Sequence, residues 1–231
     1  MTSRVQNVRT VGVVLAITAQ HQEVPSSKYP KPFTSAYIYS ADYFSKGRFE
    51  VQASMPKGKL LLAQINLYEP QENDNTWVGI ALVDFKQDSY FEVGVWETEG
   101  NFTMFEKFEH GANLSDFHVY AVERRKGHLR WFFDGYNFYN LSFTGIEPRL
   151  RSRLNSKMEI DVNLVVGGPE ITEDYSVNDT ETWVCPSLIV DYVRVFVSSN
   201  QADNVSLGEI TEKSPSEICY QVQELNKFNL T

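Results

Sequence analysis

The sequence contains no apolar run that approaches the roughly 20 residues needed by a membrane-spanning helix. Basic residues are also in short supply, because 21 lysines and arginines stand against 30 acidic residues and give a formal net charge of −9. No stripe of lysine or arginine is present that could neutralise a phosphate backbone. These absences argue against a membrane span and against nucleic acid as a partner.

Residues for metal and nucleophile chemistry are sparse as well. The four histidines are scattered without the spacing of metal ligands: His21, His110, His118 and His128. The sequence has no Gly-x-Ser-x-Gly, His-Glu-x-x-His or phosphate-loop motif. We therefore expect neither a metal site nor a cofactor.

Cysteine is limited to two residues, Cys185 and Cys219. An even number of cysteines in an oxidising compartment is typical of a disulfide, which here would tie the C-terminal tail to the last strands. Two buried, unpaired thiols are the equally open alternative.

Glycosylation sequons, in contrast, are abundant. Six Asn-x-Ser/Thr triplets occur, at Asn101, Asn113, Asn140, Asn178, Asn204 and Asn229. With 15 asparagines in the chain, chance alone would give about two. The excess predicts a glycoprotein of the secretory pathway that is secreted and extracellular, although two or three sequons could be accidental.

The first apolar segment, Val11 to Ala19, has two interpretations. Arg4 and Arg9 precede it, so it resembles the apolar part of a signal peptide. It is short, however, and its residues also fit a β-strand. We favour the strand.

Most of the chain is predicted to be β-structure, because β-branched and aromatic runs bounded by Gly, Asn, Asp and Pro recur along it. The predicted strands are 11–19, 35–39, 47–54, 60–68, 78–85, 90–96, 101–108, 117–124, 128–133, 136–143, 158–165 and 187–197. Lys126-Gly127 and Asp134-Gly135 supply the positive-φ residues of tight hairpin turns. The pattern is that of an antiparallel all-β sandwich.

Composition changes near Ser198, where aromatic residues become rare and Ser, Asn, Glu and Lys increase. We therefore expect one sandwich domain over residues 1–198 and a polar C-terminal extension over residues 199–231. A single domain of this length can bury a full core.

Six short segments, in order, resemble glycoside hydrolase family 16, the laminarinase-like jelly rolls of the concanavalin A-like type. They are Gly12 to Ala19, Lys46 to Val51, Met55 to Gly58, His128 to Gly135, Asn163 to Gly168 and Val190 to Phe196. The similarity covers about residues 10–198 and is greatest to the β-1,3-glucan recognition proteins, also called Gram-negative-bacteria-binding proteins. It implies that the chain begins partway into the family's domain, so that an N-terminal strand or module would be missing.

The family's catalytic signature is Gly-Glu-x-Asp-x-x-Glu, or Gly-Glu-x-Asp-x-Glu in one branch. A retaining glycosidase needs two carboxyl groups about 5 Å apart. The resemblance places the signature on residues 77–85, where alternation along a strand predicts that Ile80, Leu82 and Asp84 stand for the three acids. In the longer pattern the last position is Phe85. Asp84 is thus the single vestigial acid, and we expect no glycosidase activity.

Sugar binding needs aromatic faces and polar side chains. The resemblance suggests Trp77 and Trp96 as stacking residues, with Asn66, Asp84 and Asn163 as polar cleft residues. Packing in the core is the alternative for each tryptophan, and a satisfied strand amide is the alternative for Asn163. Asn66 stands where the family usually has a tryptophan.

The resemblance therefore implies a secreted, non-catalytic pattern-recognition protein that binds β-1,3-glucan of microbial surfaces in innate immunity, with proteins of an immune cascade as further partners. A protein-interaction or structural domain without sugar binding is the rival interpretation. Residual glycoside hydrolysis through Asp84 is the third.

Overall fold

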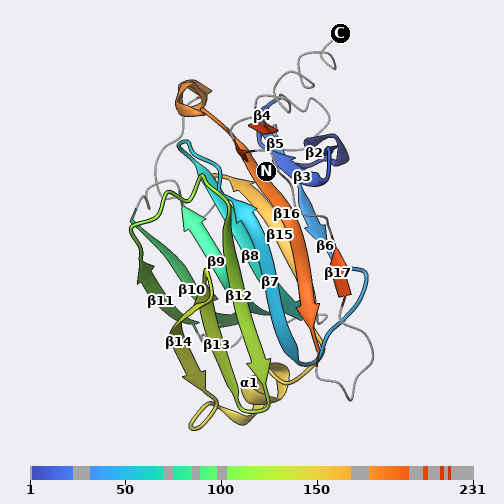
Figure 1. The fold of residues 1–231 in the computed structure, drawn as a ribbon, viewed down its shortest axis with the longest axis vertical. Helices are drawn as coiled ribbons and strands as arrows, with labels where there is room; N and C mark the ends of the chain where they lie inside the picture. The colour runs from blue at the N-terminus through green and yellow to red at the C-terminus, as the bar shows by residue number, and fades with distance from the viewer. Residues whose placement is uncertain are drawn as a thin grey trace.

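β-Strands form most of the chain that the computed structural model describes (Figure 1). The described residues are 2–22, 32–69, 75–84, 89–97, 103–167, 177–197, 205–207, 214–215 and 218–219. Two antiparallel sheets stack face to face, and a three-stranded sheet lies at one end of the sandwich. The predicted jelly-roll sandwich is confirmed.

The first sheet has six strands in the order β11 (Thr103–Glu109), β10 (Tyr90–Glu97), β9 (Thr76–Asp84), β8 (Leu61–Glu69), β15 (Glu159–Val166) and β6 (Tyr37–Tyr39). The second has the order β14 (Tyr136–Ser142), β13 (His128–Phe133), β12 (His118–Arg125), β7 (Gly47–Ser54), β16 (Ser187–Phe196), β3 (Val14–Thr18) and β2 (Val8–Val11). An eighth strand, β17 (Val205–Leu207), pairs with β16. The small sheet consists of β1 (Thr2–Ser3), β5 (Phe33–Ser35) and β4 (Gln20–His21).

The core lies between the two large sheets and follows from strand alternation. In β7, for example, Phe49, Val51 and Ala53 are fully buried, whereas Glu50 and Gln52 between them are partly exposed. A shift of one residue in register would turn this apolar set out of the core. Alternation therefore fixes the register of the central strands.

Both predicted hairpin turns are confirmed. Asp134 and Gly135 have φ angles of +46° and +81°, and Gly127 has a φ of +87°. Two successive positive φ values match the right-handed twist of the flanking strands. The meander β12–β13–β14 therefore forms as its sequence predicts.

The segment Val11 to Ala19 lies in the second sheet, which favours the strand interpretation. It is not one strand, however, because Gly12 adopts a φ of +63° and begins a turn between β2 and β3. Ala16 and Ile17 of β3 are fully buried.

Helices are few, and none among the described residues is both long and apolar enough to cross a membrane. Two 3₁₀ turns, Val5–Asn7 and Val177–Thr182, accompany the short helix α1 (Pro148–Arg153). The helix lies at the end of the sandwich opposite the three-stranded sheet (Figure 1). Its sequence position was not predicted as helical.

Cys185 and Cys219 form a disulfide with a Cα–Cα distance of 5.9 Å. The sequence left open a disulfide or two buried, unpaired thiols, and the structure contains the disulfide. Ile218 and Cys219 are buried against Val11, Val14, Ala16 and Ile189, in a small second core outside the main one. Parts of the predicted extension therefore pack on the sandwich, and its boundary at residue 198 stays a prediction.

Candidate functional site

Strand β9, which carries the signature positions, contains a β-bulge. Ile65 of β8 lies opposite Ala81, but the next residue, Asn66, lies opposite Gly79, so that Ile80 is the extra residue. The pairing with β10 shifts at the same place, since Leu82 lies opposite Glu92 and Gly79 opposite Gly94. Ile80 and Ala81 are both buried in the core, at 1% and 0% exposure. The expectation that Ile80 shares a face with Leu82 and Asp84 is therefore wrong, because the bulge breaks the alternation.

The face of the six-stranded sheet that points away from the second sheet is called the outer face below. In β9 the core residues are Val78, Ile80, Ala81 and Val83. The outer face consequently receives Trp77, Gly79, Leu82 and Asp84, of which Trp77, Leu82 and Asp84 are partly exposed.

Trp131 satisfies the backbone at the bulge. Its indole nitrogen donates a 2.7 Å hydrogen bond to the carbonyl oxygen of Gly79, reaching from β13 across the core. Trp131 is fully buried. A buried carbonyl that a bulge removes from the ladder needs such a donor.

Replacement of Trp131 by phenylalanine is expected to lower the free energy of unfolding by about 2–4 kcal/mol, because it leaves the Gly79 carbonyl without its donor and opens a cavity. Urea unfolding checks this. The matched control is Trp183→Phe, since Trp183 is only partly buried and its indole donates a solvent-exposed hydrogen bond to the Lys59 carbonyl, whose loss should cost less than about 1 kcal/mol. Equal losses for the two variants would contradict the role given to Trp131.

Four aromatic rings form a continuous row across the outer face. Tyr68 of β8 contacts Trp77 at a centroid distance of 5.3 Å, Trp77 stacks with Trp96 of β10 at 5.6 Å, and Trp96 contacts Phe105 of β11 at 5.7 Å. We call these residues the aromatic row. Trp77 and Trp96, both predicted from the sequence, therefore lie side by side, and Phe105 is 43% exposed at the open end.

Two glycines make room for the row. A Cβ atom at Gly79 would lie 2.4 Å from Leu82 and 2.9 Å from the Trp96 ring. One at Gly94 would lie 2.0 Å from the backbone carbonyl oxygen of Met104 and 2.9 Å from the Phe105 ring. Gly79 and Gly94 are opposite each other in β9 and β10. A side chain at Gly79 would displace Leu82 and the Trp96 ring, and one at Gly94 would disturb both the backbone of β11 and the Phe105 ring.

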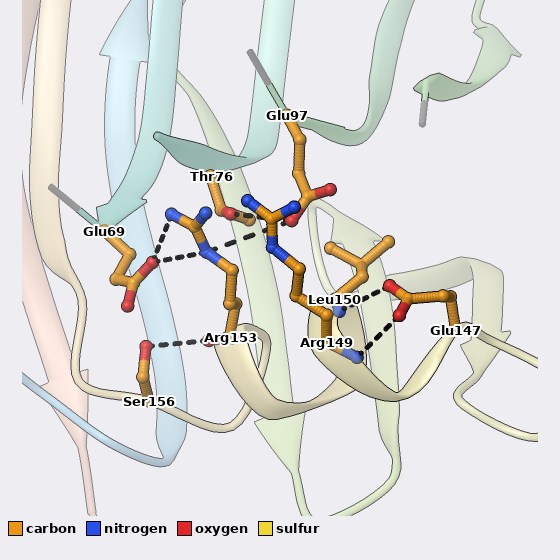
Figure 2. Close-up of polar contacts among 8 residues, drawn as sticks. All are labelled: Glu69, Thr76, Glu97, Glu147, Arg149, Leu150, Arg153 and Ser156. Atoms are coloured by element: carbon orange, nitrogen blue, oxygen red, sulfur yellow. Dashed lines mark hydrogen bonds and ion pairs between the residues drawn. The ribbon is translucent and has the colours of Figure 1, made fainter. Parts of the chain in front are cut away.

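Helix α1 anchors the strand ends beside the row (Figure 2). Arg153 donates from Nε and Nη2 to one oxygen of Glu69, at 2.9 and 2.7 Å, and lies 3.9 Å from Glu97. Thr76 bonds to the same Glu97. Glu69, Thr76 and Glu97 directly adjoin Tyr68, Trp77 and Trp96 in sequence, so this buried network fixes the backbone that carries the row.

The start of α1 is itself capped. The Glu147 carboxylate accepts hydrogen bonds from the backbone N–H groups of Arg149 and Leu150, at 3.1 and 3.2 Å, and Pro148 occupies the first helical position (Figure 2). An acid before a proline at the first turn is a typical helix start.

A second group of polar residues lies on the outer face beside the row. Asp161 accepts hydrogen bonds from the amide nitrogens of Asn163 (2.7 Å) and Asn66 (3.4 Å), and from the Tyr37 hydroxyl. We call these four residues the Asp161 cluster. Asp161, Asn66 and Asn163 are 1%, 1% and 4% exposed, whereas Tyr37 is 37% exposed.

Burial raises the pKa of Asp161 to about 6, against the opposing effect of its three donors. Burial also raises the pKa of the neighbouring Glu159. The pKa of the Tyr37 hydroxyl is raised by burial and by the Asp161 charge. No lysine or arginine of the described chain forms an ion pair with Asp161 or Glu159. The cluster therefore holds negative charge that its own fold does not neutralise.

The structure brings together four of the five predicted binding residues. Trp77 stacks with Trp96, and Asn66 and Asn163 both donate hydrogen bonds to Asp161. The fifth, Asp84, lies on the same face opposite Leu62. Sequence reasoning missed Asp161, Tyr68 and Phe105. A signal existed for Asp161, since it stands two residues before Asn163 and strand alternation puts both on one face.

Several predicted residues cannot be placed. Phe85, Asn101, Asn204 and Asn229 lie outside the described residues, as does the side chain of Asn178. Asn113 and Asn140 are exposed. Among the residues that the structure covers, no group of three or more His, Cys, Asp and Glu could hold a metal ion.

No protein-family model matches the chain. It is 27% identical over 211 residues to a β-glucanase of Rhodothermus marinus, covering 84% of this chain and 71% of that protein. It is 22% identical over 213 residues to the clotting factor G alpha subunit of Tachypleus tridentatus, covering 87% of this chain but only 30% of that subunit.

Solved structures share the fold. The endo-β-1,3-glucanase of Pyrococcus furiosus superimposes with a TM-score of 0.73 at 20% identity, over 85% of this chain and 80% of that one. SCLam, an endo-β-1,3(4)-glucanase, gives 0.70 at 17% identity, over 84% and 79%. The chain is thus similar in sequence to a β-glucanase, and it shares its fold with laminarinases and with a β-glucanase of glycoside hydrolase family 16.

Proposed function

We propose that the chain is a secreted, non-catalytic carbohydrate-recognition domain that binds β-1,3-glucan of microbial surfaces in innate immunity. The aromatic row on the outer face carries the proposal. Binding sites for sugars combine aromatic surface with a few fixed polar groups, and here the row lies beside the Asp161 cluster on one face of one sheet. Tyr68, Trp77 and Trp96 are partly exposed, and Phe105 is open to solvent.

The bulge argues against catalysis. Ile80 and Ala81 both point into the core. The outer-face residues Trp77, Gly79 and Leu82 therefore stand at the first, third and sixth positions of a six-residue stretch. The three acids of the longer signature, Glu-x-Asp-x-x-Glu, have the same spacing. None of Trp77, Gly79 and Leu82 is acidic. A retaining mechanism needs a nucleophile and an acid/base about 5 Å apart, so this arrangement offers neither carboxylate at the expected positions.

Residual hydrolysis through Asp84 is the weakest candidate. Asp84 is one carboxylate, and a partner would have to come from another strand. Glu92 of β10 lies on the outer face opposite Leu82, but it pairs with Lys107 at 3.7 Å. Glu92 is therefore already engaged with a cation of the neighbouring strand β11.

The relatives support a glucan as the ligand. The β-glucanase of Rhodothermus marinus is an enzyme of this class by name. LamA of Zobellia galactanivorans, with a TM-score of 0.68 at 20% identity, was crystallised with laminaritriose and laminaritetraose. The similarity to a clotting factor subunit supports an extracellular role in a defence cascade, with cascade proteins as further partners.

Secretion is part of the same proposal. The Cys185–Cys219 disulfide is typical of proteins in oxidising compartments. Asn113 and Asn140, both in sequons, are exposed as glycan acceptors must be. Asn101, Asn178, Asn204 and Asn229 are proposed as further acceptors from sequence alone.

Replacement of Trp77 by alanine is expected to lower the affinity for laminarin oligosaccharides at least about 10-fold, because the central ring of the row is lost. Isothermal titration calorimetry measures the effect. The matched control is Tyr136→Ala, which removes a 67% exposed aromatic ring from β14 in the other sheet and should leave the affinity unchanged.

Each outcome of that titration selects one function. Saturable heat in the wild type that is lost with Trp77→Ala supports glucan recognition through the outer face. A flat wild-type trace would favour the rival, a protein-interaction or structural domain on the same fold. Asn66, which stands where the family usually carries a tryptophan, is the observation that favours this rival.

A further inference from the structure

The Asp161 cluster contains two hydrogen-bond acceptors that have no partner. The Oδ1 atoms of Asn66 and Asn163 are both buried without a hydrogen bond. Because each amide donates its Nδ2 group to Asp161, the orientation of both side chains is fixed, and both carbonyl oxygens are left over. A carboxylate can only accept hydrogen bonds, so neither amide can turn round while Asp161 is ionised.

Such an arrangement is unfavourable for the isolated fold. A buried, unpaired acceptor costs free energy, and so does a buried carboxylate without a cation. The cluster contains two unpaired acceptors and one carboxylate without a cation, all on one face of the adjacent strands β8 and β15. Unpaired buried polar groups that cluster in this way call for a partner outside the chain.

The chemistry of that partner follows from the atoms that are free. Two carbonyl oxygens need two donors, and a negative potential favours donors over acceptors. Neighbouring hydroxyl groups of one sugar unit supply such a pair. The cluster adjoins the row directly, since Asn66 is opposite Gly79, the glycine beneath the Trp96 ring.

We infer that Asp161 is a positioning residue that holds the amides of Asn66 and Asn163 with their carbonyl oxygens free, so that they accept hydrogen bonds from two hydroxyl groups of a bound sugar unit. This inference rests on the proposed function. Tyr37 lies opposite Asn163 on the edge strand β6 and is the one exposed member of the cluster. Both amide oxygens are buried in the ligand-free fold, so a sugar unit that reaches them has to move the groups that cover them.

The decisive variant is Asp161→Asn. An asparagine at this position can donate a hydrogen bond as well as accept one, so it satisfies one of the free amide oxygens internally and removes it from the ligand. The affinity for laminaritetraose, measured by calorimetry at pH 7.5, is expected to fall at least about 10-fold. The melting temperature is expected to rise, because a buried charge has been removed. If Asp161 had a merely structural role, its replacement would lower both the affinity and the melting temperature.

The pH dependence gives a second readout. Below about pH 6, Asp161 becomes protonated and acts as a donor to an amide oxygen, so the wild-type affinity is expected to weaken between pH 7 and pH 5. The other titratable groups that face Asp161 are Glu159 on its own strand, Tyr37 on β6 and Tyr68 on β8. Glu159→Gln is therefore expected to keep the pH step, and Asp161→Asn to remove it. Asp116→Asn, in an exposed turn, serves as the unaffected control.

The outcomes separate this inference from the function on which it rests. If the wild type gives no heat with laminaritetraose, both are overturned. If the wild type binds and Asp161→Asn binds equally well with the same pH profile, only the role of Asp161 is overturned. A 10-fold loss together with a higher melting temperature supports both.

Discussion

Replacement of Arg153 by methionine is expected to lower the free energy of unfolding by about 3–5 kcal/mol. The substitution keeps much of the side-chain volume, so the loss comes from the Glu69 carboxylate, which loses two charge-assisted hydrogen bonds of 2.9 and 2.7 Å. Arg153 and Glu69 are 5% and 6% exposed. Removing one partner of a buried ion pair leaves a charge that water cannot reach. Urea unfolding at pH 7 measures the difference.

Arg151 provides the matched control on the same helix. It is exposed, and its replacement by methionine should change the stability by no more than about 0.5 kcal/mol. If Arg153→Met cost no more than Arg151→Met, the buried network could not be what fixes the strand ends beneath the aromatic row.

The charge of Asp161, unlike that of Arg153, is expected to lower the free energy of unfolding, since ionisation of this buried carboxyl destabilises the fold. The folded-state pKa of about 6 lies above the ordinary aspartate value of 3.8, so the folded state binds the proton more tightly than the unfolded state. The stabilisation is present below pH 4 and is lost as the pH rises through 6. The difference between the two pKa values corresponds to a loss of roughly 3 kcal/mol by pH 7.5.

The comparison with Asp161→Asn isolates this contribution, because all other titrating groups are shared. The wild type should lose up to about 3 kcal/mol relative to the variant between pH 4 and pH 7.5, as measured by urea unfolding at several pH values. A difference that does not change with pH would contradict the buried, uncompensated carboxylate.

A stability cost of this kind is typical of functional sites. Proteins retain strained or unpaired polar groups where a ligand needs them, and the loss is offset by packing elsewhere. The Asp161 cluster fits this description, whereas the Glu69 carboxylate is compensated by the charge and two hydrogen bonds of Arg153 and has the character of a structural element.

Much of the fold could be predicted from the sequence because strand alternation and turn residues are local signals. Phe49, Val51 and Ala53 identify their own core face, and Asp134-Gly135 identifies its own turn. Helix α1 also carries a local signal in Glu147 and Pro148, but six residues are too few for a helical period to emerge.

The bulge in β9 could not be predicted in the same way. Its residues, Gly79, Ile80 and Ala81, are all small or apolar, so no polar position marks the break in alternation. What decides it is the register with two neighbouring strands and the Trp131 donor from the opposite sheet. These are contacts between distant parts of the chain, and the sequence does not display them.

The candidate site shows the same division. Trp77, Trp96, Asn66 and Asn163 could be named individually, but their assembly depends on which strands pair. The row needs β9 beside β10, and the cluster needs β8 beside β15. Strand alternation alone puts Asp161 on one face with Asn163, but its contact with Asn66 depends on the pairing of β15 with β8.

Binding without cleavage is the central claim, and equilibrium dialysis of the glycosylated chain against laminarihexaose, followed by mass analysis of the recovered sugar, tests it directly. We expect saturable retention of the sugar inside the dialysis chamber and its recovery as intact hexaose after prolonged incubation. Shorter oligosaccharides in the recovered material, absent with Asp84→Asn, would contradict it and would show that this outer face still cuts its ligand.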